Sequence, residues 1–162
     1  MTECATEAEP WLRTTANISL PRKALILSST HNGPKVAAYQ GPSLVDAMDT
    51  WTEGWAGLAE DVPVGRGIVA ELRPFVVHLE QRGLAPTTVR AHVNNLWVIG
   101  GEIIREVNEE PRQRKLAARK LLLKAIDLGE APLARGVSEA DQNAIDATAR
   151  RLLRFMMAHG TK

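Results

Sequence analysis

Cysteine is nearly absent from this sequence, and its scarcity limits the kinds of site that the chain can hold. The one cysteine, Cys4, has no second thiol, so an intramolecular disulfide and a thiolate-rich metal centre are both excluded. A chain of 162 residues can still bury a hydrophobic core without such cross-links. We therefore expect a single globular protein of the reducing cytoplasm.

Long apolar stretches are missing as well. No run approaches the roughly 20 apolar residues that a helix needs to cross a bilayer. Residues 1–10 carry three glutamates and have neither the basic region nor the apolar core of a signal peptide, so no secretory signal is expected. These absences predict a protein without a membrane partner.

The motifs of common catalytic and cofactor sites are also absent. The sequence has no GxxxxGK[ST] phosphate loop, no GxGxxG dinucleotide loop, no HExxH, no GxSxG and no CxxC. The four histidines, His31, His78, His92 and His159, are dispersed without ligand spacing. We therefore predict a protein that is not an enzyme, with no catalytic residue, no metal and no cofactor.

Helical periodicity dominates the chain from Ser43 onward. Apolar residues recur three and four positions apart in five segments, which predicts an all-α bundle of about five helices over residues 43–160. The segments are 43–60, 68–79 with Gly83 as its end, a helix from Pro86 to Val107, 112–126, and a last helix opened by Ser138.

Several residues within these helices leave alternatives open. Pro74 indicates either a kink or the end of one helix and the start of another. The pair Gly100 and Gly101 indicates either a close helix crossing or a bend. Trp51 and Trp55 share a face with aliphatic residues, so core positions are favoured over a nucleic-acid stacking platform.

Residues 1–42 contain four prolines and no sustained helical period, and we interpret them as an irregular N-terminal arm. Within the arm, the apolar runs 24–27 and 35–39 flank an Asn-Gly pair at 32–33. This arrangement is typical of a β-hairpin, which is marginal in isolation and would need to dock.

Charge is distributed unevenly along the chain. Residues 1–110 hold 9 basic and 14 acidic residues, whereas residues 111–162 hold 11 basic and 5 acidic ones. This asymmetry indicates either an end that attracts a polyanion or two faces that attract each other. The basic residues form two clusters, Arg112, Arg114, Lys115, Arg119 and Lys120, and then Arg150, Arg151 and Arg154.

The run FVVHLEQRGLAPTTVRAHVNNLWVIGGEIIREV, residues 75–107, resembles the amino-terminal core-binding domain of the tyrosine recombinases, the phage-integrase family. Ala85 stands where that family has a capping serine, and His92 where it has an aromatic residue. The positions that match are Phe75, Leu79, Gly83, Leu84, Pro86, Thr88, Val89 and Leu96.

The resemblance implies a SAM-like helical bundle that binds double-stranded DNA. The family's catalytic domain has no counterpart, because no His-x-x-Arg motif is present and the one tyrosine, Tyr39, precedes the matching run. The resemblance thus implies a free-standing DNA-binding module that acts as a recombinase accessory factor, regulator or remnant. The predicted DNA contacts are Thr87, Thr88, Arg90, Arg112, Arg114, Lys115, Arg119, Arg150, Arg151 and Arg154.

A second function class fits the same bundle without nucleic acid. In this alternative the chain is a helical protein–protein interaction domain, a homo-oligomer or an antitoxin-like regulator, and the two oppositely charged halves dock on each other or on another copy. In the antitoxin-like case, residues 24–39 would fold onto a partner.

Overall fold

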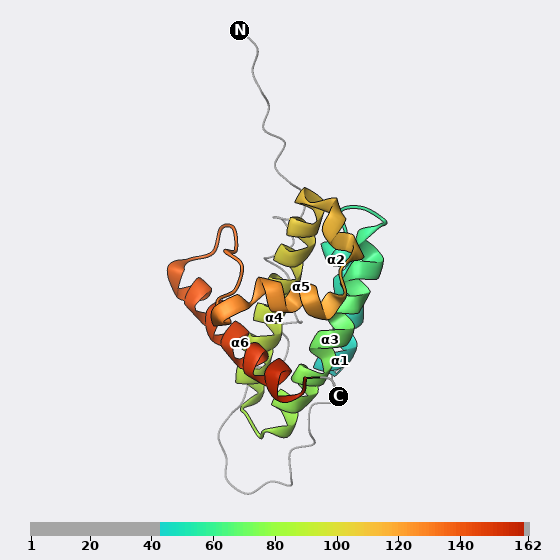
Figure 1. Cartoon of the computed structure of the whole chain (residues 1–162). Coiled ribbons are helices and arrows are strands. Elements are labelled where there is room, and N and C mark those ends of the chain that lie inside the picture. The colour runs from blue at the N-terminus through green and yellow to red at the C-terminus, as the bar shows by residue number, and fades with distance from the viewer. Residues whose placement is uncertain (1–42, 161–162) are drawn as a thin grey trace, which may run out of the picture. The chain divides into compact units, whose positions relative to one another are not determined.

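The computed structural model describes residues 43–160, which form an all-α bundle with no strand among them, as predicted (Figure 1). The predicted arm, residues 1–42, and its hairpin lie outside the described residues. The elements are α1 (Leu44–Ala47), η2 (Met48–Thr50), α2 (Trp51–Trp55), α3 (Asp61–Gln81), α4 (Pro86–Glu109), η3 (Pro111–Lys115), α5 (Ala118–Ala125), η4 (Asp127–Gly129) and α6 (Glu139–Ala158).

The first predicted helix, 43–60, is found as three short pieces that end at Trp55. Ser43 caps α1 through its side-chain oxygen, which accepts a hydrogen bond from the Val45 amide at 3.2 Å. Beyond Trp55 the chain forms a loop, because the Asp61 carboxylate accepts a hydrogen bond from the Leu58 amide at 2.9 Å instead of letting the helix continue. Trp51 and Trp55 are buried, which confirms their predicted place in the core.

Helix α3 runs unbroken through Pro74, so neither a helix end nor a restart occurs there. Pro74 is exposed, as is Arg82, the residue that follows the helix. Gly83 then adopts a φ of +68°, the left-handed conformation in which glycine stops a helix without steric cost.

The glycine pair of α4 marks a close crossing with α2. A Cβ atom on Gly100 would lie 2.4 Å from two ring carbons of Trp55, and one on Gly101 would lie 3.3 Å from the same indole. The indole of Trp55 also donates a hydrogen bond of 3.0 Å from Nε1 to the carbonyl of Trp97. Because Gly100 has no side chain, the Trp55 indole of α2 can pack directly against the backbone of α4.

The prediction of one continuous helix over 112–126 is wrong, because the segment forms two separate elements. The chain forms η3, becomes extended at Leu116 and Ala117, and only then begins α5. The break turns Arg114 toward Asp61 on α3, and it lets Leu121 and Leu122 of α5 face the core. The last helix is confirmed, since the Ser138 side chain accepts a hydrogen bond from the Asp141 amide at 3.2 Å.

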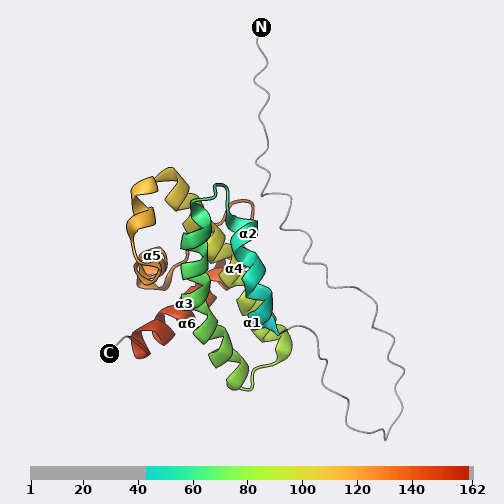
Figure 2. The ribbon, with the colours of Figure 1, turned by 90° about the vertical axis from the view of Figure 1, so that its right-hand side faces the viewer.

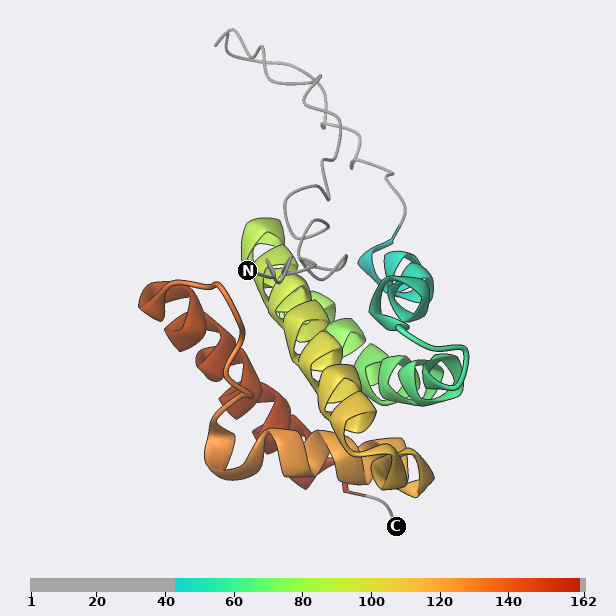
Figure 3. The same ribbon diagram turned by 90° about the horizontal axis from the view of Figure 1, so that it is seen from above.

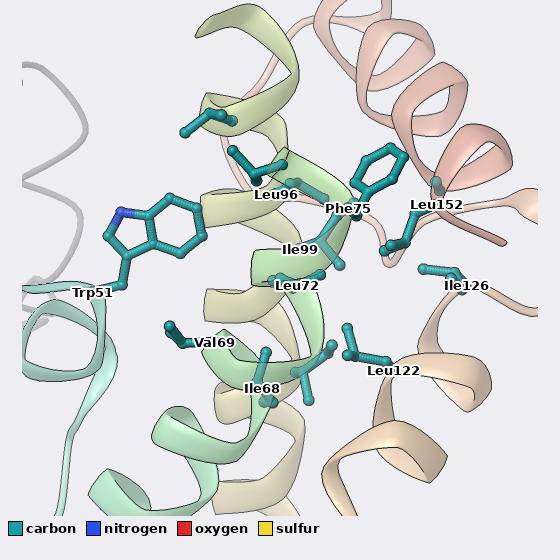
Figure 4. Close-up of a cluster of buried hydrophobic side chains, with 14 of the residues drawn as sticks. Trp51, Ile68, Val69, Leu72, Phe75, Leu96, Ile99, Leu122, Ile126 and Leu152 are labelled. Atoms are coloured by element: carbon teal, nitrogen blue, oxygen red, sulfur yellow. The ribbon is translucent and has the colours of Figure 1, made fainter. Parts of the chain in front are cut away.

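Helix α3 is the centre of the bundle. Figure 2 shows it flanked by α1 and α2 on one side and by α5 on the other, and it also packs along α4. Its buried side chains meet residues from α2, α4, α5 and α6 in one core (Figure 4). The labelled members of that core are Trp51, Ile68, Val69, Leu72, Phe75, Leu96, Ile99, Leu122, Ile126 and Leu152.

Candidate functional site

The predicted DNA contacts lie near both ends of α4 and on α5 and α6. Thr87, Thr88 and Arg90 lie in the first turns of α4, whereas Arg112, Arg114 and Lys115 lie in η3, just beyond its other end. Helix α4 has 24 residues, and at the standard rise this separates the two groups by roughly 36 Å. They cannot hold the same phosphate group.

Arg114 is part of the scaffold that joins η3 to α3. Its Nη2 atom donates to Asp61 Oδ1 at 3.0 Å and to Asn108 Oδ1 at 2.7 Å, and Glu60 lies 3.5 Å from Nη1. The side chain of Asp61 is fully buried, so this ion pair is largely removed from water. Arg114 therefore has its donors occupied within the protein.

Arg119 is also occupied within the protein. Its Nη2 donates to the carbonyl of Met156, near the end of α6, at 2.7 Å, and its Nη1 lies 3.4 Å from a carboxylate oxygen of Glu71 on α3. This side chain ties α5 to two other helices. In contrast Arg112 and Lys115 are exposed, and neither forms an ion pair with a described residue.

The two charged halves of the chain attract each other within the described domain. Five of its eight ion pairs join an acidic residue before position 110 to a basic residue after it. Lys124 Nζ, for example, lies 2.5 Å from Glu106 Oε1 and holds the pKa of that carboxyl below its usual value. The five pairs are Arg114–Glu60, Arg114–Asp61, Arg119–Glu71, Lys124–Glu106 and Arg135–Glu109.

The amino terminus of α4 is open to solvent. Thr87, Thr88 and Arg90 are exposed there, and the N-cap residue Ala85 provides no side-chain cap. Pro86 occupies the first helical position and has no amide hydrogen to donate, so the helix end offers fewer donors than usual.

The three predicted arginines of α6 lie close together on one helix. Arg150, Arg151 and Arg154 are exposed, and no carboxylate of the described residues lies within 4 Å of them. The Nε of Arg154 donates to the Arg150 carbonyl at 3.2 Å, and the stem of Arg150 packs on Gly129. The three arginines thus lie on the outer face of α6.

Large apolar side chains are exposed beside these arginines, in a place that the sequence pattern does not indicate. Leu128 in η4 is 88% exposed and Met157 in α6 is 70% exposed. A shallow hollow of about 330 Å³ lies between η4 and α6. We define the α6–η4 surface as the residues that line this hollow together with the adjacent methionine, namely Leu128, Gly129, Arg150, Leu153, Arg154 and Met157.

Leu128 is held in a backbone conformation that leucine rarely adopts. Its φ is +58°, and among the described non-glycine residues no other φ is positive. The Asp127 side chain accepts a hydrogen bond from the Leu128 amide at 2.9 Å, which helps to fix this turn. A left-handed leucine costs on the order of 1 kcal/mol and here stays in water. Strain of this kind favours a role in binding.

Helices α4 and α6 lie side by side and meet through a polar seam (Figure 3). Thr148, fully buried on α6, donates to the Ala144 carbonyl at 3.1 Å and accepts from Asn95 Nδ2 at 2.9 Å. His92 Nδ1 lies 2.8 Å from the same oxygen and acts as a second donor. Burial and the nearby charge of Arg151 lower the pKa of His92.

We predict that acidification destabilises the domain through His92. Because the folded-state pKa of His92 lies below its unfolded value, the unfolded chain binds the proton more readily, and stability is lost as the pH falls through the usual value of about 6.5. Melting temperatures measured between pH 7.5 and pH 5.5 should fall for the natural chain and fall less for His92→Asn, which keeps a donor but cannot titrate. Equal slopes for the two proteins would contradict this assignment.

Within the described residues, no group of three or more potential metal ligands is present, and no helix is long and apolar enough to cross a membrane. No protein-family model, curated protein or solved structure matches the chain. The resemblance to the recombinase core-binding domain therefore stays a prediction, as do the DNA contacts derived from it.

Proposed function

We propose that the helical domain is a non-catalytic protein-interaction module whose partner docks on the α6–η4 surface. The observation that supports this proposal is the exposure of Leu128 and Met157 beside Arg150 and Arg154, two cations that form no ion pair with a described residue. Methionine and arginine are enriched in protein interfaces, and arginine is frequent among the residues that contribute most binding energy. We place this activity in the cytoplasm.

The distribution of the other cations favours a protein partner over a phosphate backbone. Arg114 and Arg119 are occupied by ion pairs inside the domain, and the residues at the two ends of α4 are far apart. Two of the ten predicted contacts thus have partners within the domain already. The α6–η4 surface instead combines apolar area with two charges, a composition suited to a folded partner.

Site-specific photo-crosslinking tests this proposal. A photoreactive phenylalanine analogue at position 128 should give adducts with another polypeptide in the cells that make the protein, whereas the same analogue at Arg66 should not. Arg66 is a matched control because it is exposed on α3 and has no ion pair with a described residue. Absence of adducts from position 128, or equal yields from both positions, would sink the proposal.

Binding of double-stranded DNA is the second candidate function. The charge of Arg150, Arg151 and Arg154, which no carboxylate of the described residues pairs with, favours it. In this case the module would act as the recombinase-like accessory factor, regulator or remnant that the resemblance implies. The three arginines would contact phosphates from α6, and Thr88 and Arg90 would do so from the start of α4.

Salt dependence separates DNA binding from protein binding. If the three arginines each contact a phosphate, changing all three to glutamine should weaken binding to labelled duplex DNA and reduce the salt slope by about 3. Fluorescence anisotropy at several salt concentrations measures both quantities. The control is Arg66→Gln combined with Arg82→Gln, exposed cations of α3 and its end, which should change little. An unchanged slope in the triple variant would exclude this arginine face.

A further inference from the structure

The charge along α6 changes sign at its middle. The first half of the helix contains Glu139, Asp141 and Asp146, and the second half contains Arg150, Arg151 and Arg154. Acidic residues at the start of a helix and basic residues at its end also complement the helix dipole. The same distribution makes the helix complementary to an antiparallel copy of itself, because each acidic half would lie opposite a basic half.

The apolar residues around α6 are distributed over the same two ends. Met157 and Leu128 lie beside the basic half, and Val137, 37% exposed, lies just before the acidic half. An antiparallel pair of α6 helices related by a two-fold axis beside Ala147 would place Met157 of one copy near Val137 of the other. In the same register Arg154 lies within one turn of Glu139 of the second copy, and both side chains are exposed and lack an ion pair in the described domain.

Two-fold symmetry makes every such contact occur twice. An isologous interface of this kind closes on itself and gives a dimer, whereas a head-to-tail contact would continue into a ring or a filament. A parallel arrangement of the two α6 helices would instead bring Arg150 and Arg154 against the same arginines of the other copy. Charge thus selects the antiparallel orientation.

Taking the proposed protein-interaction function as its basis, we infer that the partner is a second copy of this chain, docked by antiparallel pairing of α6 with the α6–η4 surface at each end of the interface. Apolar contacts of Leu128 and Met157 contribute most of the affinity, and the pairs between Arg154 and Glu139 set the orientation. The arginines are then shared between the two copies and neutralised in the dimer.

A charge exchange tests the orientation directly. In sedimentation equilibrium of the full chain, the natural protein should dimerise, and Arg154→Glu or Glu139→Arg should each weaken the dimer about tenfold because two pairs become repulsive. The double variant with both changes should recover the affinity of the natural protein. Since Glu139→Arg also places a cation at the helix start, its melting temperature is recorded, and recovery in the double variant separates pairing from helix stability.

An apolar control completes the experiment. Met157→Asp should weaken the dimer, whereas Leu58→Asp should not, because Leu58 is 54% exposed but lies in the loop before α3. A natural protein that stays monomeric at its highest soluble concentration overturns the inference, as does a double variant that fails to recover. In the monomeric case, adducts from position 128 with a different polypeptide would leave the proposed function standing, and their absence would remove both.

Discussion

Replacing Arg114 with alanine should lower the free energy of unfolding by about 3–5 kcal/mol, because the change leaves the buried carboxylate of Asp61 without its cation. Asp61 also accepts the hydrogen bond from the Leu58 amide, so the loop before α3 depends on the same carboxylate. Urea denaturation followed by circular dichroism measures this loss. Arg112→Ala is the matched control, since Arg112 lies two residues away, is exposed and has no ion pair with a described residue. Its free energy of unfolding should stay within about 0.5 kcal/mol of that of the natural protein.

The loss of unfolding free energy in Arg114→Ala should depend on the charge of Asp61 rather than on the loss of the apolar part of the arginine side chain. In a background of Asp61→Asn the buried charge is gone, and Arg114→Ala should then cost much less than it does in the natural protein. A double-mutant cycle gives this coupling energy. If Arg114→Ala costs the same in both backgrounds, packing of the side chain and not the ion pair stabilises this junction.

The behaviour of Arg114 also decides which variants can test DNA binding. A variant that removes Arg112, Arg114, Lys115 and Arg119 together would lose two scaffold residues along with two exposed cations. Weaker binding of such a protein would reflect damage to the fold. Changes confined to Arg150, Arg151 and Arg154 avoid this problem, because no described carboxylate lies near them.

Features of the fold that depend on neighbouring residues could be predicted from the sequence. The stripe from Ile68 to Leu79, the cap at Ser138 and the helix end at Gly83 each follow from spacing or from a conformational preference within a few residues. The buried positions of Trp51 and Trp55 follow from the same periodicity.

The break at Leu116 and Ala117 has no such local signal, since neither proline nor glycine stands there. The break accompanies the pairing of Arg114 with Asp61, 53 residues earlier in the chain. For the same reason sequence spacing could not separate the scaffold cation Arg114 from the exposed cation Arg112. The exposed position of Leu128 could not be predicted either, because it lies in a left-handed turn that leucine does not favour.

The second large effect concerns Gly100. Gly100→Ala should cost about 1–3 kcal/mol by overpacking, although alanine favours helices more than glycine does, because its Cβ would lie 2.4 Å from Cη2 and Cζ2 of the Trp55 ring. Urea denaturation measures the change. Gly54→Ala in α2 is the matched control: the nearest atoms to its Cβ are those of Trp97 at 4.0 Å, so this variant should be neutral or more stable by up to about 1 kcal/mol.

A compensating change identifies the cause of the loss. The two Trp55 atoms that the new methyl group meets belong to the six-membered ring of the indole, and phenylalanine has a shorter side chain that does not reach as far. Trp55→Phe alone should destabilise the protein by leaving a cavity and by removing the hydrogen bond to the Trp97 carbonyl. In combination with Gly100→Ala, the methyl group should fill part of that cavity, so the double variant should be more stable than the sum of the two single changes predicts. Simple additivity would show that the cost at Gly100 arises elsewhere than at the contact with Trp55.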